Sequence, residues 1–416
     1  MGRRIVSAVL ALFCVLLLLG AAPGEQDTNS GFSLIVASDL HYLSPELTDH
    51  GVYFQAVMAN GDGKVTEYCE EITDAFLSEV IRQKPQALIL TGDLSFNGAR
   101  ASHESLAAKL HAVEEAGIPV YVLPGNHDLF RKTAAAFFGN GYELVPSVTG
   151  EEFREIYAAF GFEEALSRDE HSLSYTARLN DESLLLMLDA NTAHDFCSLS
   201  EKTLAWAEEQ LKLAQEQGLY VLAACHQNLF PHSMFREGYM LECAGTLYEL
   251  LEQYQVPLFL SGHMHIQHIV TIENVTEIAL SSLTMGDCRY GILRREGDGI
   301  QFEARPVDLN SWAEELGRED LPDFPAYARE SLESRTRGQA ESMLKNKDYP
   351  EEQREALLEY ACALNTAYFS GDLSGIPALD PDGSLQREWE SNATFFSTYF
   401  ASIARDIGAD YTVWSS

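Results

Sequence analysis

Short apolar runs alternate along the chain with stretches in which apolar residues recur every three or four positions. Near-continuous apolar runs are typical of parallel strands covered on both faces, and they predict strands at residues 33–38, 87–90 and 120–123. The intervening stretches 68–83 and 102–116 have the spacing of amphipathic helices. This order of elements predicts βαβ units and an α/β fold.

The same alternation resumes in the second half, with predicted strands at 184–188, 220–224 and 258–260 and predicted helices at 200–217 and 244–254. Residues 269–307 show short alternating strands separated by glycine and aspartate turns. Beyond residue 308 we find no strand pattern, only helical stretches at 351–366 and 386–407, joined by a Gly-, Pro- and Asp-rich link at 374–383. We therefore predict an α/β domain at 32–307 and a helical C-terminal domain at 308–416, whose role stays open between capping the active site, self-association and stabilisation.

The N-terminus has the composition of a targeting segment. Arg3 and Arg4 precede an apolar run from Ile5 to Leu19, and small residues follow at positions 20–22. A charged start, an apolar stretch and a small-residue exit are the features of a secretory signal. Residues 1–24 are therefore predicted to be a signal peptide or, alternatively, a retained N-terminal anchor. Both alternatives place the protein outside the cytoplasm, secreted or at the cell surface.

The charge balance narrows the classes of partner. The net charge is -35, from 63 acidic and 28 basic residues. A nucleic-acid binder needs a basic face, and docking on anionic lipid needs one as well. No nucleic-acid partner is therefore expected, and membrane attachment is expected only through an uncleaved N-terminal segment. An acidic enzyme still binds phosphate esters if bound cations invert the local potential. The seven cysteines are widely spaced and imply no disulfide framework.

Five polar clusters follow predicted strands, at the end of a strand where α/β folds bind ligands. Carboxylate, imidazole and carboxamide groups are ligands of Mn, Fe and Zn. The two oxygens of a single Asp can bridge two metal ions. Two ions held close together are what metal-assisted phosphoester hydrolysis uses. Glycines precede three of the polar residues and allow close backbone approach. The candidate ligands are Asp39, His41, Asp93, Asn126, His226, His263 and His265.

The ordered set Asp39-Leu-His41, Gly92-Asp93, Gly125-Asn126-His127-Asp128, His226 and Gly262-His263-Met-His265 resembles the signature of the calcineurin-like metallophosphoesterase superfamily. The resemblance covers residues 32–307. It implies a four-layer β-sandwich flanked by helices and two divalent metal ions. Asp39, His41 and His265 would hold the first ion, Asp93 would bridge, and the second would be completed by Asn126, His226 and His263.

The resemblance also implies a role for the remaining residues of the GNHD motif. His127 would stabilise the transition state and protonate the leaving oxygen, and Asp128 would orient it. Within the superfamily, the chain is similar to a bacterial cyclic-nucleotide-phosphodiesterase-like group with a helical C-terminal domain. Features that carry this likeness are the insert at 42–67, Ser102-His103 and the segment from Cys225 to His232. Gln227 departs from the pattern, because many members have a second histidine there.

Asn97 and His232 are the candidates for substrate binding, although loop solvation or packing is the favoured explanation for each of them. We expect a small-molecule phosphate ester as substrate. The leading hypothesis is phosphodiester hydrolysis, with cyclic nucleotides as the first substrate to test, by attack of metal-bound hydroxide. A phosphomonoesterase, or an envelope or phospholipid phosphodiesterase on the same centre, is the alternative. The remote alternative is a metal-dependent binding protein that turns over no substrate. The sequence leaves the oligomeric state open.

Overall fold

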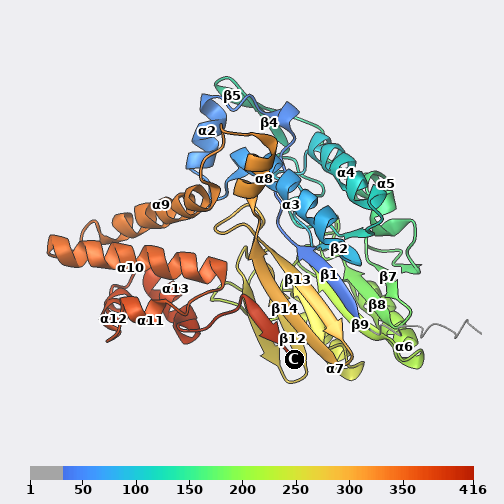
Figure 1. Ribbon diagram of the computed structural model, residues 1–416. Coiled ribbons are helices and arrows are strands. Elements are labelled where there is room, and N and C mark those ends of the chain that lie inside the picture. Colours follow the sequence, from blue (N-terminus) through green and yellow to red (C-terminus); the bar gives the residue numbers. More distant parts are fainter. Residues whose placement is uncertain (1–30) are drawn as a thin grey trace, which may run out of the picture.

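The computed structural model describes residues 31–416, and two sheets form its centre (Figure 1). The first sheet has the order β15-β14-β13-β1-β2-β3 and the second β11-β12-β10-β9-β8-β7-β6. The strands of the first are β1 Phe32–Ala37, β2 Ala87–Leu90, β3 Val120–Val122, β13 Arg289–Glu296, β14 Gly299–Pro306 and β15 Val413–Ser415. Those of the second are β6 Ser167–Arg168, β7 Tyr175–Asn180, β8 Ser183–Leu188, β9 Tyr220–Cys225, β10 Leu258–Ser261, β11 His268–Ile272 and β12 Val275–Ala279.

Burial on both faces of the second sheet explains why its central strands are continuous apolar runs. In β8, Leu185 and Met187 join the core cluster shared with the first sheet, whereas Leu184 and Leu186 join a separate cluster on the opposite face. Successive side chains of a strand point to opposite faces, so a strand buried on both sides needs apolar residues at every position.

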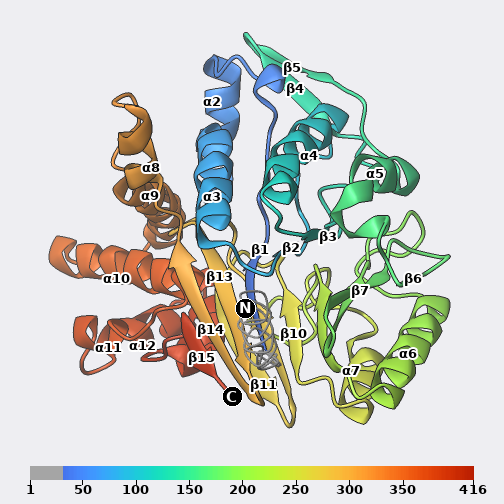
Figure 2. The same ribbon diagram turned by 45° about the vertical axis from the view of Figure 1, so that its right-hand side comes forward.

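Helices cover the outer faces of both sheets and complete the four layers of the fold. Helices α3 (Cys69–Gln83) and α4 (Arg100–Glu115) lie beside the first sheet, and α6 (Glu201–Glu216) and α7 (Ala244–Gln253) beside the second (Figure 2). β1, β2 and β3 are parallel, as are β8, β9 and β10. The carboxyl ends of these strands therefore meet at one edge, where the polar clusters of the sequence lie.

Insertions in the α/β part form small elements beyond the main layers. Helix α2 (Val52–Ala59) lies in the insert after the first polar cluster, and β4 (Ala135–Phe138) pairs with β5 (Gly141–Leu144) in a hairpin. Helix α5 (Gly150–Ile156) follows this hairpin and begins with a capping box between Thr149 and Glu152. A capping box satisfies two backbone donors at the start of a helix.

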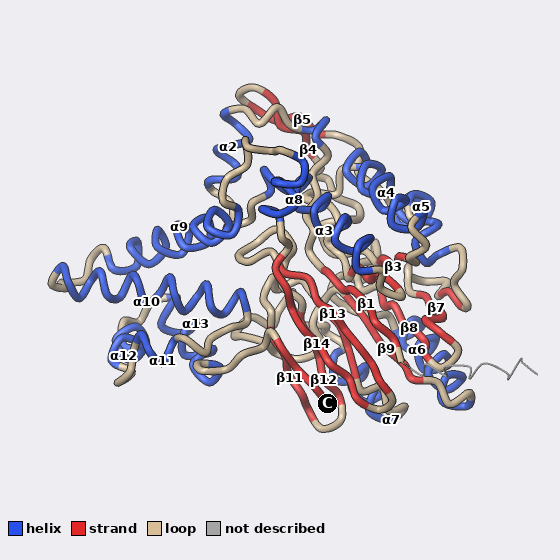
Figure 3. The backbone as a smooth tube through the Cα atoms, in the orientation of Figure 1, coloured by secondary structure: helices blue, strands red, loops and turns tan. Residues whose placement is uncertain are grey.

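The C-terminal part is helical and lies to one side of the sheets (Figure 3). Its apolar cluster also includes Ile266, next to the predicted ligand His265. The helices are α8 Leu309–Leu316, α9 Phe324–Leu344, α10 Glu351–Ser370, α11 Ile376–Leu379, α12 Ser384–Ser391 and α13 Phe395–Ile403.

Two expectations about the C-terminal part need correction. The stretch 386–407 is not one helix, because Ala393 has a φ of 52° and Thr394 is the N-cap of a new helix, α13. The last residues are not helical either, since β15 pairs antiparallel with β14 and returns the chain to the first sheet. A strand of three residues is too short to leave a recognisable alternation in the sequence.

The prediction for residues 1–24 lies outside the described residues. Among the helices that the structure describes, none combines the length and the apolar character needed to cross a membrane.

Candidate metal centre

The seven predicted ligands lie on the loops that leave β1, β2, β3, β9 and β10 at their carboxyl ends. Backbone hydrogen bonds tie these loops together. Asp39 N donates to Gly92 O at 3.0 Å, His41 N donates to Asp93 O at 3.0 Å, and Gly262 N donates to His226 O at 2.9 Å. Each loop is therefore positioned by its neighbour as well as by its own strand.

Five of the seven predicted ligands have a left-handed backbone. This conformation is uncommon for residues other than glycine and is typical of functional sites, where the surrounding structure enforces it. The φ angles are 53° for Asp39, 43° for His41, 47° for Asp93, 69° for His263 and 59° for His265.

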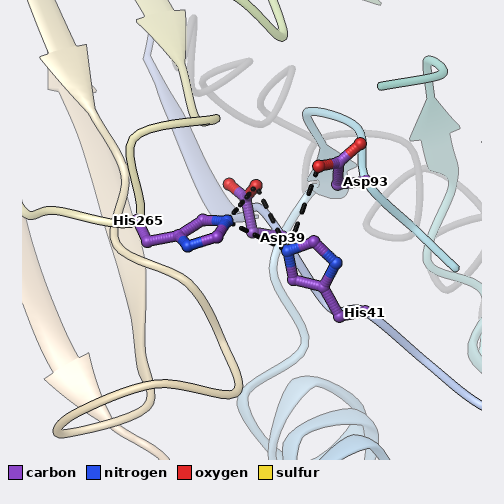
Figure 4. Close-up of side chains that lie close together, drawn as sticks. All are labelled: Asp39, His41, Asp93 and His265. Carbon is purple, nitrogen blue, oxygen red and sulfur yellow. Dashed lines mark hydrogen bonds and ion pairs between the residues drawn. The ribbon is translucent and has the colours of Figure 1, made fainter. Parts of the chain in front are cut away.

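The first group of donors comes from Asp39, His41, Asp93 and His265 (Figure 4). One side-chain donor atom from each of the four lies within 4.8 Å of the others. Nε2 of His41 and Nε2 of His265 are 3.0 Å apart, and Oδ1 of Asp39 is 3.3 Å from the latter. Three of these residues are buried and His265 is partly exposed, so the group opens to one side.

The second group comes from Asp93, His226 and His263, whose donor atoms likewise lie within 4.8 Å of one another. Nε2 of His226 is 3.4 Å from Oδ2 of Asp93 and 3.0 Å from Oδ1 of Asn126. Asp93 belongs to both groups, which is the position expected of a bridging carboxylate.

Backbone carbonyls set the orientation of two histidine rings. Nδ1 of His226 hydrogen-bonds with Thr91 O at 2.9 Å, which directs Nε2 toward Asp93. Nε2 of His263 hydrogen-bonds with Gly238 O at 2.8 Å, which leaves Nδ1 as its metal-facing atom. Such outer contacts fix the tautomer and the ring plane of a ligand. No sequence signal marks these two contacts, because every residue carries a carbonyl.

Electrostatics favours the ligating form of most of these groups. Burial and the nearby charge of Lys64 lower the pKa of His41 well below its ordinary value, and burial with His226 lowers the pKa of His263 to about 4. Burial acts to raise the pKa of Asp93, but the surrounding histidines outweigh it and hold this pKa well below the usual range. Burial alone would lower the pKa of His226, yet Asp93 raises it to about 9. His226 would therefore have to lose a proton to hold a cation at Nε2.

The donor set fits divalent metal ions. Nδ1 of His41 is buried without a hydrogen-bond partner, and Oδ1 of Asp39 is buried with only the Nε2 atoms of His265 and His41 near it. A buried carboxylate surrounded by neutral imidazoles is costly unless a cation compensates its charge. Imidazole and carboxylate donors converging at this spacing suit Mn, Fe and Zn.

Glycine at three turns allows the loops to approach this closely. A Cβ at Gly125 would lie 2.2 Å from Oδ1 of Asp93, and one at Gly262 would lie 2.5 Å from Oδ2 of Asp39. Gly92, with a φ of +99°, would bring a Cβ to 2.7 Å from Nδ1 of His226. Any side chain at these positions would displace a predicted ligand.

His127 lies at the open side of the cluster, with Nε2 4.0 Å from Oδ2 of Asp93. Its Nδ1 hydrogen-bonds with Phe96 O at 2.9 Å, so the ring presents Nε2 toward the cleft. Its backbone N donates to Oδ1 of Asp93 at 2.7 Å. The side chain is 32% exposed, so the ring is accessible from the cleft.

Asp128 has a different place from the one predicted. Its buried carboxylate accepts hydrogen bonds from Leu94 N, Ser95 N, Ser95 Oγ and Gly125 N. Within the described residues none of its hydrogen bonds reaches the His127 ring, which Phe96 orients instead. Asp128 therefore holds the loop after β2, which carries Asp93, against the loop after β3.

The two candidates for substrate binding lie in different environments in the structure. Asn97 donates to Ala135 O at 2.9 Å and lines a cleft together with His127. His232 is fully buried, with Nδ1 2.9 Å from Nδ1 of His268 and Nε2 3.1 Å from Glu277. A side chain without exposed surface does not contact a substrate, so this geometry gives His232 a structural place.

Gln227, the departure from the superfamily pattern, pairs with an amide. Nε2 of Gln227 donates to Oδ1 of Asn191 at 2.6 Å, and Nδ2 of Asn191 donates back to Oε1 at 3.2 Å. Nδ2 of Asn191 also reaches Pro124 O, next to the glycine before Asn126. The pair links the loops after β8, β9 and β3 behind the predicted ligands.

A cleft of about 530 Å³ opens onto both donor groups. Helices α10 and α13 contribute Phe369 and Tyr399 to its wall, so the C-terminal part borders the site. The Tyr239 ring lies 5.1 Å from the ring of His263, and the Phe235 ring lies 5.5 Å from that of Tyr239. Sequence reasoning missed these aromatic residues, because nothing near them in the chain distinguishes them from core residues.

The chain belongs to the calcineurin-like phosphoesterase family, whose profile matches residues 32–267. The fold of these residues is therefore that of the calcineurin-like phosphoesterases. Residues 308–410 match a second profile, described as the C-terminal domain of cyclic nucleotide phosphodiesterase. The predicted superfamily and the predicted type of C-terminal domain are thus confirmed.

Two relatives of the chain are named as cyclic nucleotide phosphodiesterases. A 3′,5′-cyclic-nucleotide phosphodiesterase from a Nostoc species is 25% identical over 199 residues, and a probable cyclic nucleotide phosphodiesterase from Vesicomyosocius okutanii is 23% identical over 191 residues. The matches cover 46% and 45% of this chain and 62% and 66% of the relatives' own lengths. A dimetal phosphatase from Danio rerio has a similar structure, with a TM-score of 0.50 and 12% identity over 66% of this chain and 96% of that chain. This last likeness supports the fold.

Proposed function

We propose that this chain is a dinuclear phosphodiesterase, with cyclic nucleotides as the leading substrate class. The observation that carries the proposal is the position of Asp93, which belongs to both donor groups. A carboxylate shared between two sites at this spacing suits two ions held close enough to act on one phosphate. In this assignment Asp39, His41 and His265 complete the first site, and the second is completed by Asn126, His226 and His263.

The residues around the centre have separate tasks in the proposed reaction. When bound, the ions supply an activated water and neutralise charge on the phosphate. His127 holds Nε2 toward the cleft and gives a proton to the leaving oxygen. Phe96 O holds the ring in this orientation through Nδ1, and Asp128 keeps the neighbouring loop in place.

Two features support a cyclic nucleotide over a simpler ester. The relatives and the profile that matches residues 308–410 are named for cyclic nucleotide phosphodiesterases. The cleft is also lined by Phe235, Tyr239 and Tyr399, whose flat rings suit a planar base. An apolar wall with a few polar groups at one end is typical of a site for a small organic ligand.

The first experiment is a substrate panel on protein loaded with Mn, Fe or Zn. It should contain 2′,3′- and 3′,5′-cyclic nucleotides, bis(4-nitrophenyl) phosphate and 4-nitrophenyl phosphate. We expect both diester classes to be hydrolysed faster than the monoester. Faster hydrolysis of the monoester would contradict the diesterase assignment, and two bound metals without turnover of any ester would contradict an enzymatic role.

Substitution His127→Ala tests the proton donor. General acid catalysis contributes roughly 10²–10⁴-fold, so we expect kcat to fall by about this factor while metal content stays near that of the parent protein. Metal content is measured by elemental analysis and kcat with bis(4-nitrophenyl) phosphate. His111→Ala is the matched control, since His111 lies on the exposed side of α4. Near-normal turnover of His127→Ala would remove His127 from the mechanism.

We also propose export of the chain, on the composition of residues 1–24, and a division into domains near residue 308. Export is tested by fractionating cells that produce the full chain and determining the N-terminal residue of the exported form. Recovery of the full-length protein in the cytoplasm would contradict it.

A further inference from the structure

A second cleft adjoins the first on the far side of His127. Its volume is about 510 Å³, and Asp62, Lys64 and His127 line both clefts. Asn97 lines only the second one. A ligand that reaches from one cleft into the other must pass His127, the proposed proton donor.

The second cleft is cationic in a strongly acidic protein. The net charge is -35, yet the described residues give its wall three cationic side chains, Lys64, Arg131 and Arg335, against the single carboxylate of Asp62. Asp62 forms an ion pair with Lys64. Within residues 31–416, neither arginine forms an ion pair. The cleft therefore holds two positive charges that no carboxylate neutralises, which favours the approach of an anion.

Arg131 is held in place by contacts that do not use up its hydrogen-bonding capacity. Its side chain crosses Gly98, where a Cβ would lie 2.4 Å from Arg131 Cγ. Nη1 donates to Asn126 O at 3.1 Å, whereas Nε is buried without a hydrogen-bond partner. This arginine therefore connects the second cleft directly to a proposed metal ligand.

Arg335 reaches the same cleft from helix α9 of the C-terminal part. Its Nε is also buried without a partner, as is Oδ1 of Asn97. One turn earlier, Leu332 packs against Gly63, where a Cβ would lie 3.3 Å from Leu332 Cδ1. The contact places the segment Asp62–Lys64 against α9, so both parts of the chain build this wall.

Lys64 is fixed between the two clefts. Its backbone forms an antiparallel bridge with Met285, and Val65 N donates to Thr284 O at 2.8 Å. Only 9% of its side chain is exposed. Lys64 lines the first cleft together with Asp93, His263 and His265, and it lines the second cleft as well. A phosphoryl group between the clefts would thus meet Lys64 on one side and the proposed metal ions on the other.

We propose that Lys64, Arg131 and Arg335 form a subsite for a second phosphoryl group of the substrate. Within the proposed class, the preferred substrates are then cyclic nucleotides and other nucleotide phosphodiesters that carry a further phosphate monoester. Guanidinium groups bind phosphate through paired, charge-assisted hydrogen bonds, so two arginines without carboxylate partners in one cleft suit a phosphoryl group. This inference rests on the proposed phosphodiesterase function and specifies its substrate class.

The test compares two esters that differ only in the second phosphate. Thymidine 5′-(4-nitrophenyl phosphate) and its 3′-phosphorylated form both release 4-nitrophenol, so kcat/KM is measured in the same way for each. Charge-assisted hydrogen bonds support a preference of about tenfold or more for the 3′-phosphorylated ester in the parent protein. In Arg335→Gln this ratio should fall severalfold, and Arg335→Lys should retain part of it. Arg329→Gln on the same helix is the control, because Arg329 pairs with Asp287 outside the cleft.

The ratio separates this inference from the function on which it rests. If neither ester nor bis(4-nitrophenyl) phosphate is hydrolysed, the phosphodiesterase proposal fails. If both esters are hydrolysed equally well, or if Arg335→Gln keeps the full preference, the subsite proposal fails while the function stands. Equal use of both esters with pyrophosphate inhibition that Arg335→Gln weakens would also overturn it, in favour of a free anion as the occupant.

Discussion

At the scale of single residues, the polar groups near the proposed ligands divide into those that face the cleft and those that hold loops. His127 and Lys64 face the cleft, whereas the carboxylate of Asp128 is fully buried and bonded to backbone donors. The GNHD motif identified the position of Asp128, but the sequence could not show that its partners are amide groups of two loops. Backbone partners leave no trace in residue type.

Asp128→Asn tests this distinction. The new amide would place an NH₂ group against backbone N–H donors, so we expect the free energy of unfolding to fall by roughly 2–3 kcal/mol. It is measured by chemical denaturation of metal-free protein. A large loss of kcat with unchanged unfolding free energy would instead support direct action on His127.

A second buried carboxylate makes stability depend on pH. Burial raises the pKa of Asp189 from 3.8 to about 6. Between these values the folded state keeps a proton that the unfolded state has lost, so this group's contribution to stability falls as pH rises and levels off above about pH 6. The Asp189→Asn variant has no carboxyl group at this position, so its stability does not show this decrease with pH.

Between pH 5 and pH 7.5 the parent protein should therefore lose about 1 kcal/mol of unfolding free energy that Asp189→Asn does not lose. Chemical denaturation at the two pH values measures it. The substitution also removes one acceptor at any pH, so only the pH-dependent part tests the prediction. Asp181→Asn, at an exposed position, is the control.

At the scale of elements, β8, β9 and β10 and the helices α6 and α7 lie within a residue or two of their predicted bounds. Strong periodicity explains this agreement, since β8 and β9 are apolar at nearly every position. Helix α2 and the hairpin of β4 and β5 were not predicted. The hairpin has exposed positions along β5 and no alternation to mark it. Its structure depends on contacts with α2, which are remote in the sequence.

The C-terminal end of α10 is where the helical part touches a loop of the metal centre. Gly371 has a φ of +82°, and a Cβ there would lie 2.6 Å from Gln267 O, two residues after His265. We expect Gly371→Ala to lower the free energy of unfolding by about 2 kcal/mol or more, from backbone strain and displacement of this loop.

Gly338→Ala provides the matched control for this prediction. Gly338 lies within α9, and a Cβ there would have no neighbour within 4 Å. Alanine is a better helix former by roughly 1 kcal/mol, so this variant should be slightly more stable than the parent. Equal effects of the two substitutions in denaturation would contradict the contact at Gln267.

At the scale of the whole molecule, the proposed ligands extend from residue 39 to residue 265 and come from both sheets. Ions that bind only this folded arrangement stabilise it by mass action, by about 2.7 kcal/mol when free metal is a hundredfold above Kd. Removal of metal with a chelator should lower Tm by several degrees, as measured by calorimetry. The shift should disappear in Asp93→Ala, and an equal shift in that variant would contradict the shared position of Asp93.

The arrangement of the first sheet has a consequence for synthesis of the chain. β1 lies between β2 and β13, and its partner β13 begins only at Arg289, late in the chain. A nascent chain emerges from the ribosome N-terminus first, so one edge of β1 stays unpaired until most of the protein has been made. Exposed apolar strand edges promote aggregation. We therefore expect the ribosome-bound intermediate to need a chaperone, and the metal centre to assemble only after translation has passed β13.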